Sequence, residues 1–112
     1  MKTDKIKAQM RKGILELCVL SIISNKEAYP SDIINALKNN KLIVVEGTLY
    51  PLLKRLKDAD FLSYQWKEST IGPPRKYYQI TDIGKDFLTD LLVTWDDLNS
   101  AVNKSIKTLK VK

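Results

Sequence analysis

The chain has 112 residues, 44% of them hydrophobic, and a formal net charge of +6 from 19 basic and 13 acidic side chains. This length predicts one domain with a small core. With no histidine and a single cysteine, the sequence excludes Ser-His triads, zinc-finger spacing and an internal disulfide. Residues 1–80 carry the whole excess of positive charge, with 14 basic and 8 acidic residues, which favours a polyanionic partner, nucleic acid first.

The N-terminus lacks the apolar core of a signal peptide, and no apolar run approaches the ~20 residues of a membrane span. We therefore expect a cytoplasmic, soluble protein without membrane contact. The acidic residues are scattered and no glycine-rich phosphate loop occurs, so we expect no enzyme, no metal and no cofactor. Cys18 lies in an apolar run and is expected to be a buried hydrophobic residue rather than a redox sensor.

The first predicted helix covers residues 4–24, with Thr3 or Asp4 as its cap. Its segment 14–23 is almost entirely apolar, so more than one side should be buried, and a dimer partner is the expected cover. Pro30 suits the first position of a second helix that extends to about Asn39. Residues 41–45 form a short extended run, a candidate strand of a small sheet.

The third predicted helix begins at residue 46 or 47 and ends near residue 59. Its apolar stripe is formed by leucines 49, 52, 53 and 56, and its other face carries Thr48, Tyr50, Pro51, Lys54, Arg55 and Lys57. Such a face suits a DNA groove, where phosphates attract cations and base edges take hydrogen bonds; the alternative is a solvated surface. The proline, about four residues in, predicts a bent or late-starting first turn.

A β-hairpin follows, with strands at 61–68 and 75–80 and a turn at 69–74. Arg75 and Lys76 form a basic leading edge on the return strand. By strand alternation, one ring of the pair Tyr77 and Tyr78 should face the core.

The last predicted helix covers residues 82–109 and is capped by Thr81. Its apolar positions recur at steps of three and four, close to a coiled-coil seam, and the expected dimerisation residues are Leu91, Trp95, Leu98, Val102 and Ile106. A helix of roughly 28 residues extends ~40 Å, too far to pack fully on the remaining body.

The element order predicts a mostly α fold with a small β-hairpin (α+β). Residues 1–80 form a winged helix-turn-helix DNA-binding domain, and residues 81–112 form a long C-terminal dimerisation helix. The third helix would enter a major groove while the cationic hairpin reaches the neighbouring minor groove or backbone. A second copy would place two such helices ~34 Å apart, one turn of DNA.

Four segments of the sequence resemble one family, the PadR-like transcriptional regulators. Residues 11–16, Arg-Lys-Gly-Ile-Leu-Glu, resemble the opening helix, and residues 47–56, Gly-Thr-Leu-Tyr-Pro-Leu-Leu-Lys-Arg-Leu, resemble the recognition helix. Residues 72–78, Gly-Pro-Pro-Arg-Lys-Tyr-Tyr, and 81–84, Thr-Asp-Ile-Gly, are similar to the wing and the last cap. The resemblance spans essentially the whole chain, in particular the compact subgroup with one C-terminal helix.

The resemblance implies a homodimeric repressor that binds double-stranded DNA. The implied DNA-binding residues are Thr48, Tyr50, Pro51, Lys54 and Arg55 in the recognition helix and Arg75 and Lys76 in the wing. The family usually starts the second helix with a Tyr-Gly-Tyr-like motif, whereas this chain has Tyr29-Pro30-Ser31-Asp32, so Ser31 becomes the expected phosphate donor. The resemblance also implies a channel between the long helices for a small planar aromatic effector, lined by Trp95, Leu91, Leu92 and Ile14.

The sequence thus predicts a sequence-specific DNA-binding transcriptional regulator, a repressor acting as a homodimer on an inverted-repeat operator and relieved by an aromatic ligand. Two alternatives stay open. Trp95 is explained equally well by simple packing in a dimer core, and a winged helix can serve as a protein-interaction module without binding nucleic acid.

Overall fold

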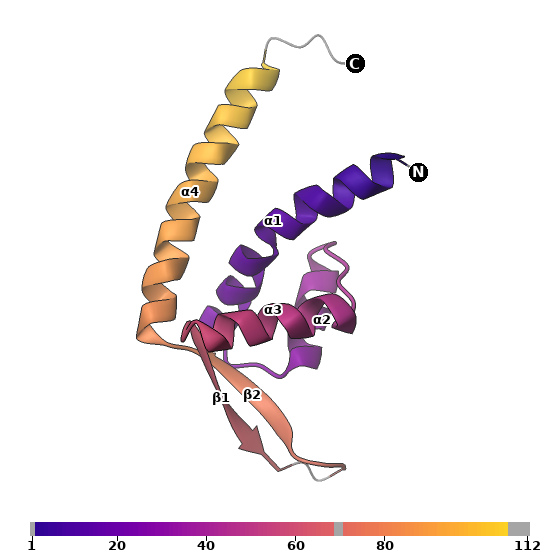
Figure 1. Cartoon of the computed structure of the whole chain (residues 1–112), viewed down its shortest axis with the longest axis vertical. Helices are drawn as coiled ribbons and strands as arrows, with labels where there is room; N and C mark the ends of the chain where they lie inside the picture. The colour runs from indigo at the N-terminus through magenta and orange to yellow at the C-terminus, as the bar shows by residue number, and fades with distance from the viewer. Residues whose placement is uncertain (1, 69–70, 108–112) are drawn as a thin grey trace.

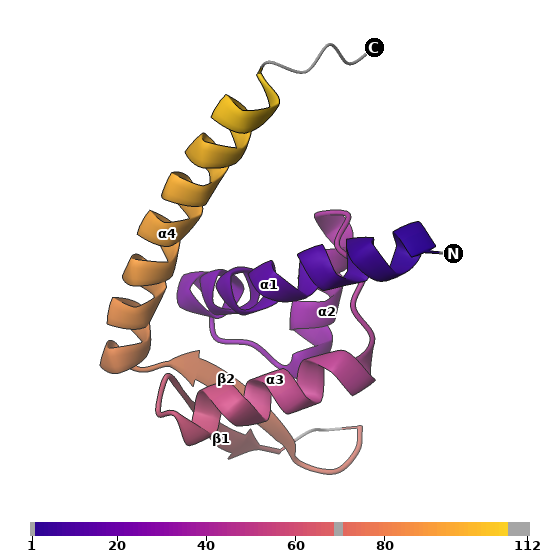
Figure 2. The same cartoon turned by 45° about the horizontal axis from the view of Figure 1, so that its top comes forward.

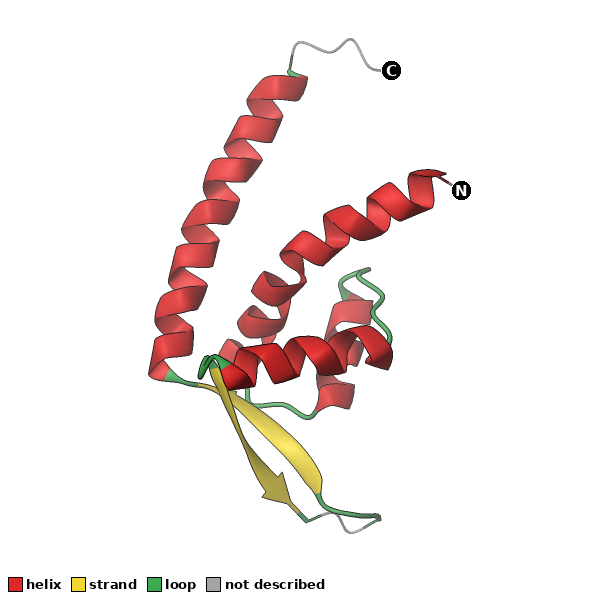
Figure 3. Cartoon of the chain, in the orientation of Figure 1, coloured by secondary structure: helices red, strands yellow, loops and turns green. Residues whose placement is uncertain are grey.

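The computed structural model describes residues 2–68 and 71–107. Its elements are α1 (Lys2–Asn25), α2 (Pro30–Asn39), α3 (Glu46–Asp58), β1 (Leu62–Lys67), β2 (Arg75–Ile80) and α4 (Asp82–Ile106). The first three helices and the hairpin form one body, from which α4 rises beside α1 (Figure 1). Figure 3 shows helices as the dominant structure and the hairpin as a projecting ribbon, so the predicted α+β winged helix is confirmed.

The core lies where α1, α2 and α3 cross above the base of the hairpin (Figure 2). α2 and α3 bury the apolar residues predicted by their periodicity, because that arrangement removes apolar surface from water. In α1 the core face is formed by apolar residues of the 14–23 segment, while Ile6 and Met10 are exposed. The residues of this hydrophobic core are Leu15, Val19, Leu20 and Ile23 of α1, Ile33 and Leu37 of α2, Leu49, Leu52, Leu53 and Leu56 of α3, and Ala28, Val44, Leu62, Tyr78 and Leu88 elsewhere.

The expectation of a strand at residues 41–45 is wrong. α2 ends in a turn in which Lys41 takes a left-handed conformation, with φ of 69°. The backbone N–H of Leu42 donates to the carbonyl of Leu37 at 2.8 Å, which satisfies one of the last helical carbonyls. The chain then runs directly into α3 with Val44 buried in the core, so these residues never reach a strand edge.

The structure corrects two further expectations about helix starts. α1 includes Thr3 and Asp4 within the helix, so neither residue is its cap. The first turn of α3 does not start late, because the N–H groups of Thr48 and Leu49 already donate to the carbonyl of Val45, at 3.0 and 3.1 Å. Pro51 therefore lies inside a helix that begins at Glu46. Its missing N–H affects the exposed start of the helix, where carbonyls can bind water instead.

The hairpin has a regular antiparallel register in which Leu62 faces Ile80, Tyr64 faces Tyr78 and Lys67 faces Arg75. Tyr78 is buried and Tyr77 is half-buried, which confirms that one ring of this pair faces the core. A third segment extends the sheet by one bridge. The N–H of Ala28 donates to the carbonyl of Tyr78 at 3.0 Å, and the N–H of Tyr78 donates back at 2.8 Å. The start of α2 is therefore fixed to β2.

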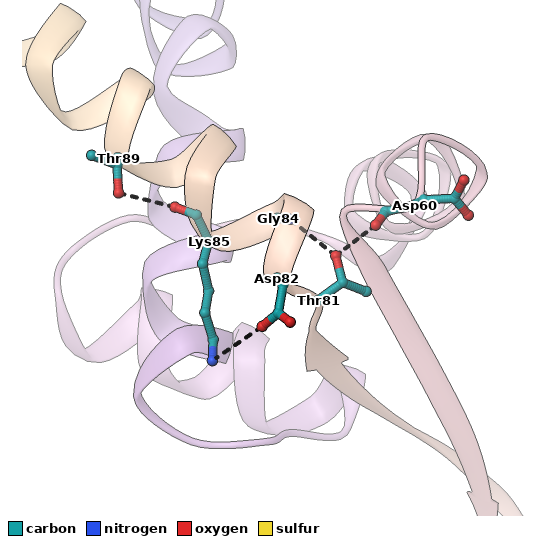
Figure 4. Close-up of polar contacts among 6 residues, drawn as sticks. All are labelled: Asp60, Thr81, Asp82, Gly84, Lys85 and Thr89. Atoms are coloured by element: carbon teal, nitrogen blue, oxygen red, sulfur yellow. Dashed lines mark hydrogen bonds and ion pairs between the residues drawn. The ribbon is translucent and has the colours of Figure 1, made fainter.

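The base of α4 is fixed to the turn before β1 (Figure 4). The Thr81 hydroxyl accepts the Gly84 N–H at 2.9 Å and donates to the Asp60 carbonyl at 2.6 Å, so the predicted cap is confirmed. The rings of Phe61 and Phe87 stack with centroids 4.1 Å apart. Beyond Leu91, the described part of α4 is exposed along its length to Ile106; the predicted last turn, to residue 109, lies outside the described residues.

Candidate nucleic-acid interface

The exposed face of α3 carries the five residues that the sequence assigned to DNA. Because leucines occupy the buried stripe, the opposite face presents Thr48, Tyr50, Pro51, Lys54 and Arg55, all exposed. Tyr50 keeps 48% of its surface exposed although it is a large aromatic residue. The face therefore offers hydroxyl groups, an apolar ring and cations on one rigid element.

The two cations of this face are paired with acidic residues of the same chain. Lys54 Nζ lies 2.8 Å from Asp58 Oδ2, one helical turn later, and this contact raises the pKa of Lys54 and lowers that of Asp58. Arg55 Nη2 lies 3.5 Å from Glu16 Oε1 on α1. Both pairs are exposed, so each contributes little stability and can be exchanged for phosphate contacts at small cost.

Arg75 and Lys76 do not lie at the tip of the hairpin. Arg75 is the first residue of β2, and its guanidinium donates from Nη2 to Ser31 Oγ at 2.7 Å. Its Cζ lies 3.9 Å from the centroid of the Tyr29 ring. The Lys76 Nζ lies 4.6 Å from the ring centroid of Tyr64, so both cations rest on aromatic side chains.

A hollow of about 380 Å³ lies where α2, α3 and the hairpin meet. It gathers four of the residues predicted to bind DNA from three separate elements. Its lining consists of Pro30, Ser31, Glu46, Tyr50, Trp66, Arg75, Lys76 and Tyr78. Two cations against one carboxylate give these walls a net positive charge.

A second hollow, of about 480 Å³, lies between α1 and the start of α3. Thr48, Pro51 and Arg55 line it together with Lys12 and the exposed Ile43 and Val45. Seven of the eight predicted DNA-binding residues therefore line one or the other of two hollows, and Lys54 lines neither.

Comparison with known proteins decides the family. The model of the PadR-like transcriptional regulator family matches residues 19–90, more than half of the chain. The chain belongs to the PadR-like family. The resemblance noted in the sequence is thereby confirmed, and this family is one of transcriptional regulators rather than enzymes.

Solved structures agree with this assignment. The chain is 57% identical to a PadR-like transcription factor from Bacteroides fragilis, covering 89% of this chain and 97% of that one with a TM-score of 0.76. It is 37% identical to a PadR-like transcriptional regulator from Bacillus cereus, covering 93% and 99%, with a TM-score of 0.76. A PadR family regulator from Eggerthella lenta is 30% identical, covers 95% and 93%, and has a TM-score of 0.86.

Sequence reasoning missed Tyr29 and Trp66 as parts of this PadR-like interface. Trp66 alternates with Leu62 and Tyr64, which favours a core position, yet it is 63% exposed because the hairpin extends beyond the body. Tyr29 precedes α2 and matches the first tyrosine of the family's motif, but that resemblance assigned it no role. Only the packing of β2 against the start of α2 brings Tyr29 under the Arg75 guanidinium.

The predicted ligand-binding residues of this PadR-like chain lie together on the side of α1 that faces α4. Ile14, Leu91 and Trp95 line one small hollow, of about 90 Å³, and Leu92 joins Trp95 and Ile14 in a neighbouring hollow of about 530 Å³. Glu16 also lines the smaller hollow. Within residues 2–68 and 71–107, no group of three or more acidic or cysteine side chains is placed to hold a metal.

The predicted dimerisation residues form an uncovered apolar stripe on the PadR-like chain's α4. Leu91 is half-buried, whereas Trp95, Leu98, Val102 and Ile106 are each between 41% and 56% exposed. The first half of α1 adds exposed Ile6 and Met10. None of the helices in the described part of the chain is both long and apolar enough to cross a membrane.

Proposed function

We propose that this PadR-like regulator binds double-stranded DNA as a homodimer and represses transcription at an inverted-repeat operator. The observation that carries the proposal is the hollow between α2, α3 and the hairpin. It gathers Ser31, Arg75 and Lys76 with Tyr50 from the exposed face of α3. A dimer bound across a promoter would exclude polymerase from it.

The residues of α3 would divide between base and backbone contacts. Thr48, Tyr50 and Pro51 offer hydroxyl groups and an apolar ring, which suit base edges and thymine methyl groups in the major groove. Lys54 and Arg55 would exchange their carboxylate partners for phosphates or guanine edges. This exchange leaves Asp58 and Glu16 without their cations, so it lowers the net gain from each DNA contact.

The proposed dimer uses the apolar stripe of α4. The exposed residues Trp95, Leu98, Val102 and Ile106 recur at helical spacing, and burying them against a partner would remove a large apolar surface from water. Residues 1–80 would then be the DNA-binding unit and residues 81–112 the dimerisation helix. The anchoring of Gly84 and Leu88 in the body supports a rigid connection between the two.

Selection of bound fragments from the source genome tests this function. We expect an inverted repeat whose half-sites are centred about one DNA turn, ~34 Å, apart. By fluorescence anisotropy, binding to that fragment should weaken steeply between ~50 and ~300 mM salt, because basic side chains release counterions from phosphates. Fragments without a repeat, together with binding that ignores salt, would refute the proposal and favour the alternative of a protein-interaction module.

We further propose that the dimer admits a small planar aromatic effector beside Trp95, which would relieve repression. The support is the exposure of this ring next to apolar Ile14 and Leu91. Planar aromatic dyes should quench tryptophan fluorescence in the protein. The quenching should persist in Trp66→Ala and disappear in Trp95→Ala. If no dye changes the fluorescence, Trp95 serves only dimer packing.

A further inference from the structure

Arg75, the first residue of β2, belongs to a continuous series of contacts between aromatic and basic side chains. The Lys67 Nζ lies 3.8 Å from the ring centroid of Tyr77, and the rings of Tyr77 and Tyr29 lie 4.8 Å apart. The Arg75 Cζ lies 3.9 Å from the Tyr29 ring on the other end. We call these four side chains, Lys67, Tyr77, Tyr29 and Arg75, the Tyr29 stack. It joins both strands of the hairpin to the segment before α2.

Two further contacts hold the Tyr29 stack in place. The Arg75 guanidinium donates to Ser31 Oγ at 2.7 Å, so one of its five N–H donors is committed to the first turn of α2. The backbone bridge between Ala28 and Tyr78 holds the two segments together independently of the side chains. A long arginine side chain on an exposed hairpin would otherwise sample many rotamers, and ordering it on binding would cost entropy.

We propose that Tyr29 and Ser31 are positioning residues that hold Arg75 ready for a DNA backbone phosphate beside the start of α2. In this arrangement Arg75 does not enter the minor groove from the tip of the wing. The Ser31 hydroxyl accepts a hydrogen bond from Arg75 and keeps its own hydrogen to donate, so both side chains can donate hydrogen bonds to the oxygens of one phosphate group. This inference rests on the proposed DNA-binding function and assigns a role to the tyrosine that precedes α2.

The chemistry fits a phosphate better than a base edge. The guanidinium lies on the rim of the hollow with Lys76 and the Tyr50 side chain, where cationic and hydroxyl groups converge from three elements. Its Cζ lies over the Tyr29 ring and Ser31 takes one of its five N–H donors, so four donors remain for phosphate oxygens, which a guanidinium can bind in a bidentate manner. Glu46, which also lines the hollow, adds one negative charge, so the two cations Arg75 and Lys76 give the site a net positive charge.

A double-mutant cycle tests whether Tyr29 acts through Arg75. The probe is a fluorescein-labelled 30-base-pair duplex of mixed sequence, since phosphate contacts do not depend on sequence, and anisotropy gives the binding constant at several salt concentrations. Arg75→Ala should lower the slope of log K against log salt by about 2 per dimer, because each lost phosphate contact contributes ~0.9. Tyr29→Leu should move the slope toward that value.

The decisive comparison uses the Arg75→Ala background. There Tyr29→Leu should change neither affinity nor slope, because the side chain that it positions is already absent. Ser31→Ala should leave the slope unchanged in that background, because its hydroxyl carries no charge and can lose only its own hydrogen bond to the phosphate. Tyr29→Phe keeps the ring and should bind like the wild type. Lys38→Ala, at the other end of α2, removes one charge away from the hollow and controls for net charge.

The outcomes separate this inference from the proposed function. Wild-type protein that fails to bind the duplex at low salt refutes DNA binding itself. Wild-type binding with additive losses for Tyr29→Leu and Arg75→Ala, or an unchanged slope in Arg75→Ala, refutes the positioning role alone. Thermal unfolding of each variant checks that it folds, and Ser31→Ala, an exposed position, keeps the test open if Tyr29→Leu is unstable.

Discussion

Replacing Gly84 with alanine should destabilise the protein at the joint between α4 and the body formed by the first three helices and the hairpin. A β-carbon at this position would overlap the carbonyl oxygen of Phe61 and lie 2.8 Å from Ile80 Cγ1 and 2.9 Å from the Phe61 carbonyl carbon. Favourable carbon–carbon contacts lie at ~3.5 Å or more, so the contact with Ile80 alone requires the joint to open by about 0.7 Å, and the overlap with the Phe61 carbonyl oxygen requires more.

The cost follows from the contacts that this opening disturbs. Overpacking against backbone costs about 1–3 kcal/mol, and loosening the hydrogen bond from the Thr81 N–H to the Phe61 carbonyl, 3.1 Å long, adds about 1 kcal/mol. The greater helix propensity of alanine relative to glycine stabilises the variant by at most ~1 kcal/mol. We expect a net loss of about 2 kcal/mol, which lowers the midpoint of thermal unfolding by roughly 10 °C in a domain of this size.

Circular dichroism melts at one fixed protein concentration would measure this loss, since the proposed dimerisation would make the midpoint depend on concentration. Gly47→Ala is the matched control. A β-carbon at Gly47, also within a helix, meets no atom within 4 Å, so that variant should melt at or above the wild-type temperature. If Gly84→Ala melts as high as Gly47→Ala, the close approach of α4 to Phe61 does not constrain the joint.

Three further predictions concern single side chains. Glu16→Gln removes the carboxylate that pairs with Arg55, so the affinity for duplex DNA should rise roughly 1.5- to 5-fold per protomer, the equivalent of ~0.2–1 kcal/mol. Anisotropy titrations would measure this rise. A lower affinity would mean that Glu16 holds Arg55 in an orientation that favours DNA binding. Burial raises the pKa of the Tyr78 phenol, so its contribution to stability is complete below the ordinary pKa near ~10 and is lost as the pH rises through the raised pKa. Between about pH 9 and 11 the melting temperature of Tyr78→Phe should therefore fall less than that of the wild type. Equal falls in melting temperature would contradict this. Burial also raises the pKa of the half-buried Cys18 thiol, so iodoacetamide should alkylate the native protein several-fold more slowly than the urea-unfolded chain; equal rates would reopen a redox role.

Local patterns in the sequence were sufficient for the order and type of the elements. The leucine stripe of α3, the proline at the start of α2 and the Thr81 cap each express a short-range rule, and the structure has each of them where the pattern indicated. The candidate strand at 41–45 failed because the tertiary path overrode its β-branched composition. The left-handed turn at Lys41 ends α2, and Val44 then packs into the core, so the segment does not pair as a strand.

The candidate site likewise has one part that the sequence predicts and one part that depends on tertiary packing. The sequence by itself determined which side chains of α3 face outward, because helical periodicity and burial of leucines leave no other choice. Only the tertiary structure decided that Arg55 pairs with Glu16 and that Arg75 rests on Tyr29 and Ser31. These contacts join residues 39 to 46 positions apart, and nothing in a short window of sequence encodes a meeting that depends on how separate elements pack.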